Sequence, residues 1–373
     1  MASQIANPAG IPPDITCPVP LSSTASPAAA RRATASAAVP VARAETLPWV
    51  NVLRLAGATG VVLIHVAMLF LTSVEPSSAR WWMALAADSA MRWAVPIFLM
   101  VSGALLLDDS RRESPLTFYR KRTCRIAIPL VFWALAETAW ETSLRCDGLL
   151  GFLAKVPSVA LTSHLWYLTV ALWLYVITPP LRFLLRRLSE GQRWALTVAV
   201  LAASEAWIYL ANWPAQNWTY LSFYLLGFQL RRVRLASVRS WMLVAAILIS
   251  LSLLVAARAA CWSSFGPVND NKLFRRHQNP LVIVMAASIF LLVVRRLGSA
   301  QPGRWSRVLS WAAPATLGIY LVHPFVQEGL TALGLQAVLP PEAVVPVVWL
   351  AVLGVSFALV QAIRCVPLLR RTV

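Results

Sequence analysis

The chain has 373 residues, of which 58% are hydrophobic and only 13% are charged. Soluble globular domains carry about 25% charged residues, so this composition excludes an ordinary soluble protein and indicates a polytopic membrane protein. The formal net charge is +18. Because the cytoplasmic loops of membrane proteins collect Lys and Arg, this excess does not require nucleic acid as a partner.

The chain divides into a polar tail and an apolar remainder. Residues 1–46 are rich in Ala, Pro and Ser and show no hydrophobic periodicity. Such a segment buries too little apolar surface to offset the entropy of ordering, so we expect a disordered cytoplasmic tail. Residues 47–373 are expected to form one transmembrane domain. The amino end lacks the pattern of a cleaved signal peptide.

Ten apolar segments follow the tail, and each is a candidate membrane helix because about 20 apolar residues span a bilayer. The sequence therefore predicts an all-α, polytopic integral membrane protein. The expected helices occupy residues 50–71, 83–107, 126–144, 160–180, 194–211, 217–230, 241–257, 280–294, 309–330 and 343–363.

The distribution of Lys and Arg predicts the orientation of these helices. With the amino terminus inside, ten spans place 24 of these residues on the cytoplasmic side and 7, including Arg258, on the outer side. This asymmetry follows the positive-inside rule and predicts that both termini are cytoplasmic. Cys146 and Cys261 then both face outward, where a disulfide between them is permitted. No CxxC or His–Cys cluster is present, so we expect no metal site.

The first apolar segment, 50–71, carries two ionisable residues, Arg54 and His65. Eleven residues of helix separate them by roughly 16 Å, so His65 lies near the middle of the bilayer if Arg54 lies at its cytoplasmic face. A cation inside a membrane helix costs about 2.5–3.5 kcal/mol or more and usually marks a functional site. Arg54 also fits an interfacial anchor, and His65 also fits a hydrogen bond to a neighbouring helix.

The second segment holds Asp88 and Arg92 four residues apart on one helix face, which predicts an internal ion pair. Because buried charges are generally paired, we favour a structural role for this pair. The segment ends in AVPIFLMVSGALLL. In this stretch Pro96 is expected to bend the helix, and Gly103 is expected to allow close packing.

Four cations, Arg120, Lys121, Arg122 and Arg125, lie in the loop expected before the third helix. One interpretation is positive-inside charge together with contacts to phospholipid head groups. The other is a phosphate site, since Arg binds phosphate oxygens through two parallel hydrogen bonds. Their spacing alone favours neither interpretation.

Three of the four histidines are expected at mid-depth or nearer the outer face. After His65, His164 begins the fourth segment as SHLWYL, where Trp166 is typical of an interfacial belt. His323 lies in LGIYLVH of the ninth segment, with Tyr320 one turn below it. Polar groups that converge at similar depth indicate a cavity open to the outside. His277 is expected to be a solvated residue of an external loop.

Together these motifs resemble the acyltransferase-3 family of integral-membrane O-acyltransferases. The resemblance covers the chain from about residue 48 onward and rests first on the Arg-x10-His pattern of Arg54 and His65. It also includes VPIFLMVSG, the Arg-x-x-Arg of Arg122 and Arg125, HLWYL and LGIYLVH, in this order. The chain looks most like the bacterial branch that contains the enterobacterial common antigen O-acetyltransferase.

The resemblance implies transfer of an acyl group, usually acetyl, from cytoplasmic acyl-CoA to a sugar hydroxyl of a cell-envelope glycan. It implies a multi-pass protein of the cell inner membrane. His65 would be the essential histidine, with Arg54 as its motif partner. Arg122 and Arg125, with Lys121 beside them, would bind the CoA phosphates.

The expected mechanism places the pantetheine arm of CoA along the way to His65, which acts as general base or as transient acyl carrier. Tyr320 and His323, with His164 and Trp166, are expected to line the acceptor side. The competing hypothesis is an exporter or flippase of a saccharide or acylated glycan. A transporter has no need for Arg-x10-His together with Arg-x-x-Arg on the donor face.

Overall fold

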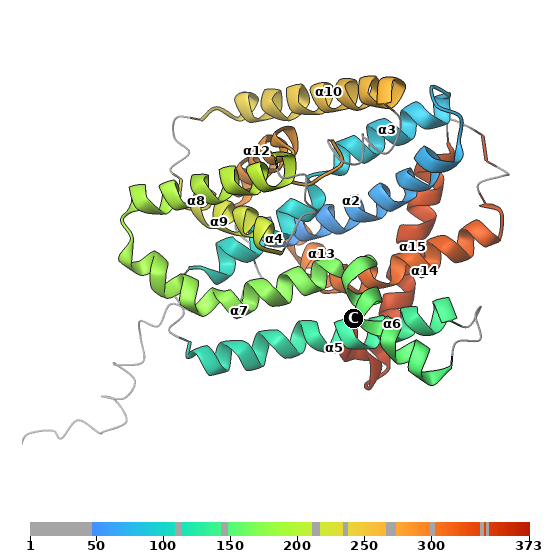
Figure 1. Ribbon diagram of the computed structural model, residues 1–373, viewed down its shortest axis with the longest axis horizontal. Helices are drawn as coiled ribbons and strands as arrows, with labels where there is room; N and C mark the ends of the chain where they lie inside the picture. Colours follow the sequence, from blue (N-terminus) through green and yellow to red (C-terminus); the bar gives the residue numbers. More distant parts are fainter. Residues whose placement is uncertain are drawn as a thin grey trace, which may run out of the picture. The chain divides into compact units, whose positions relative to one another are not determined.

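The computed structural model describes residues 47–108, 113–142, 148–210, 217–233, 238–265, 274–298, 303–335, 339–340 and 343–373. The described part consists of helices and their connections, and it contains no strand (Figure 1). The expected all-α class is therefore confirmed for these residues. The predicted tail, 1–46, lies outside them.

The helices are named in chain order. They are α2 (Pro48–Ser73), α3 (Ala79–Met91), α4 (Ala94–Leu106), α5 (Pro115–Thr142), α6 (Leu149–Thr162), α7 (Trp166–Arg187), α8 (Glu190–Glu205), α9 (Leu221–Leu230), α10 (Ser240–Phe265), α12 (Pro280–Leu297), α13 (Arg304–Ala312), α14 (Thr316–Ala332) and α15 (Val344–Cys365). Short π and 3-10 turns are η2 (Ala206–Leu210), η3 (Asn217–Tyr220), η4 (Ala313–Ala315) and η6 (Leu369–Arg371).

Seven helical stretches among the described residues are long and apolar enough to cross a membrane, and they coincide with seven of the ten predicted segments. They are Pro48–Ser73, Ala79–Leu106, Trp166–Arg187, Ser240–Ser264, Pro280–Leu297, Trp305–Ala332 and Val344–Cys365. The other predicted segments correspond to α5, to α8 with η2, and to η3 with α9. That these also cross the membrane, and that both termini are cytoplasmic, stays a prediction.

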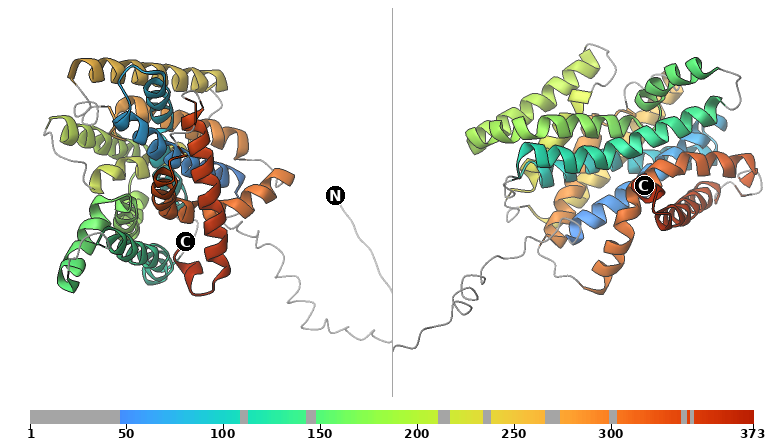
Figure 2. Two further views of the ribbon diagram at one scale, coloured as in Figure 1. Left: turned by 90° about the vertical axis from the view of Figure 1, so that its right-hand side faces the viewer. Right: turned by 90° about the horizontal axis from the view of Figure 1, so that it is seen from below.

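Helix α2 is the element around which the others pack. It contacts α3, α4, α12, α13, α14 and α15, and Figure 1 shows it running between them. Helices α5 and α7 run side by side in both Figure 1 and Figure 2. Residues on α2 can therefore meet residues from both halves of the chain.

Helices α4 and α9 cross with their backbones in contact at two glycines. A Cβ atom added at Gly103 would lie 1.8 Å from the Tyr224 carbonyl oxygen, and one at Gly227 would lie 2.0 Å from that of Met100. Only glycine permits this approach. The close packing expected at Gly103 is therefore confirmed.

The predicted helix 83–107 is wrong as a continuous element, because α3 ends at Met91 and α4 begins at Ala94. The break lies one turn before Pro96. Proline has no N–H to donate to the carbonyl of Arg92, and its ring clashes with that carbonyl. The regular helix is thus interrupted at Arg92 and Trp93, which keep αR dihedrals within one helical stretch, Ala79–Leu106.

The four cations placed in a loop before residue 126 lie instead within a helix, since α5 begins at Pro115. The Ser114 hydroxyl accepts a hydrogen bond from the Thr117 N–H at 3.3 Å, and Pro115 occupies the first helical position. Both residue types favour a helix start. Apolar length alone missed this start because the first turns of α5 are polar.

Two further segments are divided by turns. The predicted helix 160–180 consists of the end of α6, a turn at 163–165 and the start of α7, so His164 lies in the turn. The predicted helix 309–330 begins as α13 and continues as α14 after the 3-10 turn at Pro314. Each turn changes the direction of the helix that follows it.

Candidate functional site

A cavity of about 400 Å³ is lined by four arginines from three helices. Arg54 comes from α2, Arg122 and Arg125 come from α5, and Arg364 comes from the last turn of α15. No Asp or Glu is among the described residues that line it. We call this space the arginine cavity. Four like charges around one space repel one another, so the cavity is suited to a polyanionic ligand.

Sequence reasoning identified three of these arginines and missed the fourth. The sequence shows Arg364 as one more positive charge at the end of an apolar segment, and only the packing of α15 brings it to the cavity. Lys121, which was grouped with Arg122 and Arg125, does not line the cavity. Its ammonium group lies 2.7 Å from the Glu113 carboxylate, and its side chain is 64% exposed.

The three histidines expected to converge lie side by side. The ring of His323 on α14 lies 4.8 Å from that of His65 on α2 and 5.9 Å from that of His164, centroid to centroid. We call these three residues the histidine cluster. Convergence was predicted from depth alone, and the contacts themselves come from the packing of α2 against α14.

The protonation pattern of His323 follows from its neighbours. Its Nδ1 lies 2.6 Å from the Tyr320 carbonyl oxygen and 3.2 Å from that of Ile319. A carbonyl only accepts, so Nδ1 carries the proton and Nε2 is the acceptor in the neutral ring. This Nε2 is buried and has no hydrogen-bond partner among the described residues.

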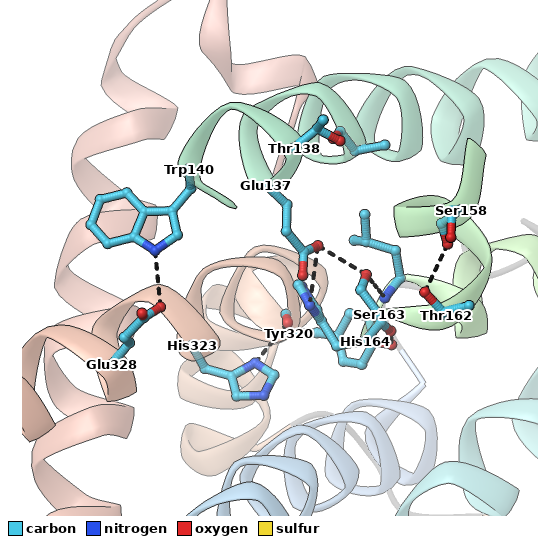
Figure 3. Close-up of polar contacts among 12 residues, drawn as sticks. Glu137, Thr138, Trp140, Ser158, Thr162, Ser163, His164, Tyr320, His323 and Glu328 are labelled. Atoms are coloured by element: carbon cyan, nitrogen blue, oxygen red, sulfur yellow. Dashed lines mark hydrogen bonds and ion pairs between the residues drawn. The ribbon is translucent and has the colours of Figure 1, made fainter. Parts of the chain in front are cut away.

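His164 is held by a carboxylate to which the sequence assigned no role. The Glu137 Oε2 lies 3.6 Å from His164 Nδ1 and accepts a hydrogen bond from the Ser163 hydroxyl at 2.9 Å (Figure 3). The His164 Nε2 is buried without a hydrogen-bond partner in the described part of the chain. The carboxylate therefore orients the ring, and the second ring nitrogen stays available.

Tyr320 connects the arginine cavity with the histidine cluster. Its side chain lines the cavity, and its ring lies 5.8 Å from that of His164 and 6.0 Å from that of His323. Its hydroxyl donates to the backbone carbonyl of His164. A ligand that fills the arginine cavity therefore meets Tyr320, whose ring separates it from His164 and His323.

Trp166 lies beside the cluster rather than in it. Its ring stacks on His277 at 5.9 Å between centroids and packs on Tyr220 at 5.1 Å. The expectation that His277 is a solvated surface residue is therefore wrong. Burial, with the nearby charge of Arg92, lowers the pKa of His277 to about 3. This histidine stays neutral near pH 7.

The ion pair predicted between Asp88 and Arg92 is present and has a third member. The Arg258 guanidinium lies 2.6 Å from the Asp88 carboxylate and donates to the Ser89 hydroxyl at 2.8 Å. The placement of Arg258 in an outer loop is therefore wrong. Helix α10 continues to Phe265, which buries Arg258 fully among the helices.

Two further sequence predictions concern metals and cysteines. Among the described residues, no group of three or more His, Cys, Asp or Glu side chains is spaced to hold a metal ion. Cys146 lies outside the described residues. Its disulfide with Cys261 therefore stays a prediction.

Comparison with known proteins gives one match. The model of the acyltransferase-3 family, described as an acyltransferase domain, matches residues 47–365. No curated protein and no solved structure matches the chain.

Proposed function

Because the chain belongs to the acyltransferase-3 family and is thus a membrane acyltransferase, we propose that it is an O-acetyltransferase. The donor in this proposal is acetyl-CoA from the cytoplasm. The acceptor is a hydroxyl of a cell-envelope polysaccharide or a lipid-linked saccharide. The protein would work in the cell inner membrane with both termini in the cytoplasm.

The observation that carries the proposal is the arginine cavity, whose lining residue Tyr320 packs against the histidine cluster. CoA bears several phosphates, and guanidinium groups bind phosphate oxygens through paired hydrogen bonds. Arg122, Arg125 and Arg364 would hold the phosphates, while Arg54 on α2 would contact the donor further along. The thioester would then meet Tyr320 and the histidines.

The histidine cluster supplies the proton chemistry of the proposed transfer. As general base, His65 takes the proton of the acceptor hydroxyl while the oxygen attacks the thioester carbonyl. The C–S bond then breaks, and the proton passes to the CoA sulfur. As acyl carrier, the imidazole attacks the thioester carbonyl, the C–S bond breaks, and CoA leaves as the thiol with the imidazole proton. The acceptor oxygen then attacks the acyl-imidazole, and the hydroxyl proton returns to the released imidazole.

The competing role of a saccharide exporter is less well supported by these features. A transporter of neutral saccharides has no use for a cavity lined by four arginines and no carboxylate among the described residues. The chain nevertheless places polar groups deep among its helices, as transporters do. The two roles differ in their product, since only the acyltransferase forms an ester.

The experiment pairs a gene deletion with reconstituted protein. Envelope glycans of the deletion strain are analysed by mass spectrometry for loss of an acetyl ester. Purified protein in lipid nanodiscs is then given labelled acetyl-CoA and deacetylated glycan. Label transferred to glycan as a base-labile ester supports the proposal. Unchanged glycan acetylation in the deletion strain, together with no transfer in nanodiscs, contradicts it.

A further inference from the structure

A second cavity, of about 590 Å³, lies between α5, α6 and α14. Its charged lining comprises three carboxylates, Glu137, Glu141 and Glu328, and one cation, Lys155. Trp140 and Phe325 are its aromatic walls. We call it the acidic cavity. Its charge is opposite in sign to that of the arginine cavity.

The acidic cavity is connected to the histidine cluster through Glu137. Glu137 lines it and lies 3.6 Å from the His164 ring nitrogen. Pro324 and Phe325, which also line it, directly follow His323 in α14. Figure 3 shows Glu137 pointing from α5 toward His164, with His323 nearby on α14. A molecule in this cavity would thus contact the carboxylate that holds His164.

The carboxylates keep capacity for further hydrogen bonds. Glu328 accepts one from the Trp140 indole N–H at 3.0 Å, and Glu141 lies 3.0 Å from the Lys155 ammonium. An ionised carboxylate offers about four acceptor positions, so these partners leave room for hydroxyl donors. The three groups are tied to separate partners and do not converge as metal ligands do.

The aromatic rings complement the carboxylates. Trp140 and Phe325 pack edge to face, with centroids 6.1 Å apart. The C–H face of a pyranose is apolar while its rim carries hydroxyls, so a sugar suits a site that combines ring faces with acceptors. An indole fixed by Glu328 presents such a face in a defined orientation.

Independent support comes from the unpartnered histidine nitrogens. The His164 side chain is 5% exposed, and its Nε2 lacks a hydrogen-bond partner among the described residues, as does that of the fully buried His323. A buried acceptor without a donor is costly. Each ring thus keeps one acceptor position for a donor group, and the cavity-lining Glu137 lies at the other nitrogen of His164.

We propose that the acidic cavity binds the acceptor sugar, and that it selects neutral or amino sugars and rejects anionic ones. This inference rests on the proposed acyl transfer for its biological role. The carboxylates accept hydroxyl and ammonium protons, and they repel a uronate or a sugar phosphate. The bound sugar would then lie beside Glu137, the carboxylate that contacts His164 in the histidine cluster.

The test measures sugar binding in nanodiscs without acyl-CoA, by saturation-transfer NMR titration. The probes are 4-nitrophenyl β-glucoside, β-glucosaminide and β-glucuronide, which share one aglycone and differ in charge. We expect the glucuronide to bind about tenfold more weakly than the other two, as like charges would require. Equal affinity for glucuronide and glucoside, or no binding of any probe, would overturn the proposal.

Variants separate the charge of the cavity from its aromatic walls. Glu328→Gln should reduce the difference in affinity between glucosaminide and glucuronide severalfold. Phe325→Leu should weaken the binding of all three probes to the same extent. Glu190→Gln, at an exposed position that lines neither cavity, is the matched control and should change nothing. An unchanged difference in affinity between these two probes in Glu328→Gln would count against selection of the sugar by its charge.

The two proposals fail in different ways. A protein that binds glucoside selectively but transfers no acetyl group contradicts the proposed function and supports the cavity assignment. A protein that acetylates glycan while binding all three probes equally overturns the cavity assignment alone.

Discussion

Two buried polar clusters lie on different helices, and they differ in how completely their atoms are paired. In the charge cluster of Asp88, Arg92 and Arg258, the carboxylate bonds both guanidinium groups, and Arg92 also donates to the Arg275 carbonyl at 2.9 Å. In the histidine cluster, two ring nitrogens have no hydrogen-bond partner among the described residues. Removing polar groups from water costs free energy in both clusters. Only the charge cluster offsets this cost fully through hydrogen bonds and ion pairs within the protein.

This difference separates structure from function. Paired charges hold α3 to α10 and satisfy one another within the protein. The unpartnered nitrogens of His164 and His323 keep their capacity for a substrate proton. Substitutions in the charge cluster should therefore lower stability, whereas substitutions in the histidine cluster should lower transfer.

The largest expected effect is that of His65→Ala on acyl transfer. General acid–base catalysis contributes about 10²- to 10⁴-fold, so the rate should fall by a factor in this range. Because no paired charge is lost, the unfolding temperature should stay within a few degrees of the parent. Labelled acetyl transfer and thermal unfolding are measured on the same nanodisc preparation. A wild-type rate of transfer in His65→Ala would contradict a catalytic role of His65.

Asp88→Asn should act on stability instead. Removing the carboxylate leaves Arg92 and Arg258 buried without their counter-charge, which costs about 3–5 kcal/mol. We expect a clear drop in unfolding temperature and in the yield of folded protein, while the transfer rate per folded molecule stays close to wild type. A stable Asp88→Asn protein with no transfer would place this carboxylate in the chemistry.

Arg122→Ala should weaken donor binding. Loss of one guanidinium from the arginine cavity should raise the KM for acetyl-CoA about tenfold, with little change in kcat. Lys121→Ala is the matched control from the next position of α5, since Lys121 pairs with Glu113 outside the cavity. Initial rates at varied acetyl-CoA give both constants. Equal effects of the two substitutions would argue for general surface charge rather than a phosphate site.

The smallest expected effect concerns pH and His277. Burial lowers the pKa of His277 to about 3, whereas an unfolded histidine titrates near 6.5. Between these values the unfolded chain binds more protons, so the free energy of unfolding falls as the pH drops through this window. His277→Gln should flatten that fall between pH 7 and pH 5, as followed by thermal unfolding. If the unfolding temperature changed with pH as steeply as in the wild type, groups other than His277 would cause the pH dependence.

Hydropathy and residue chemistry predicted much of this molecule. The seven helices that are long and apolar enough to cross a membrane follow from apolar length, and the pairing of Asp88 with Arg92 follows from helical spacing. The meeting of His65, His164 and His323 followed from their common depth. These features depend on one segment at a time, or on depth alone.

Features that depend on lateral packing were not predictable in this way. Arg258 joins Asp88, and Arg364 joins Arg54, only because helices distant in sequence lie together. The role of Glu137 depends on the turn that places His164 beside it. The break at Arg92 arises because Pro96 disrupts a helix that the length of the apolar segment alone predicts to be continuous. Periodicity along one segment carries no information on which helix lies beside it.

The most direct test of the central claim compares His65→Ala and Asp88→Asn side by side in nanodiscs. The quantity measured is the rate of acetyl transfer from acetyl-CoA to glycan per folded molecule, together with the unfolding temperature. We predict that His65→Ala unfolds like wild type and loses transfer, while Asp88→Asn unfolds at a lower temperature and retains transfer. Loss of transfer in Asp88→Asn with full activity in His65→Ala would show that the chemistry lies in the charge cluster and not in the histidine cluster.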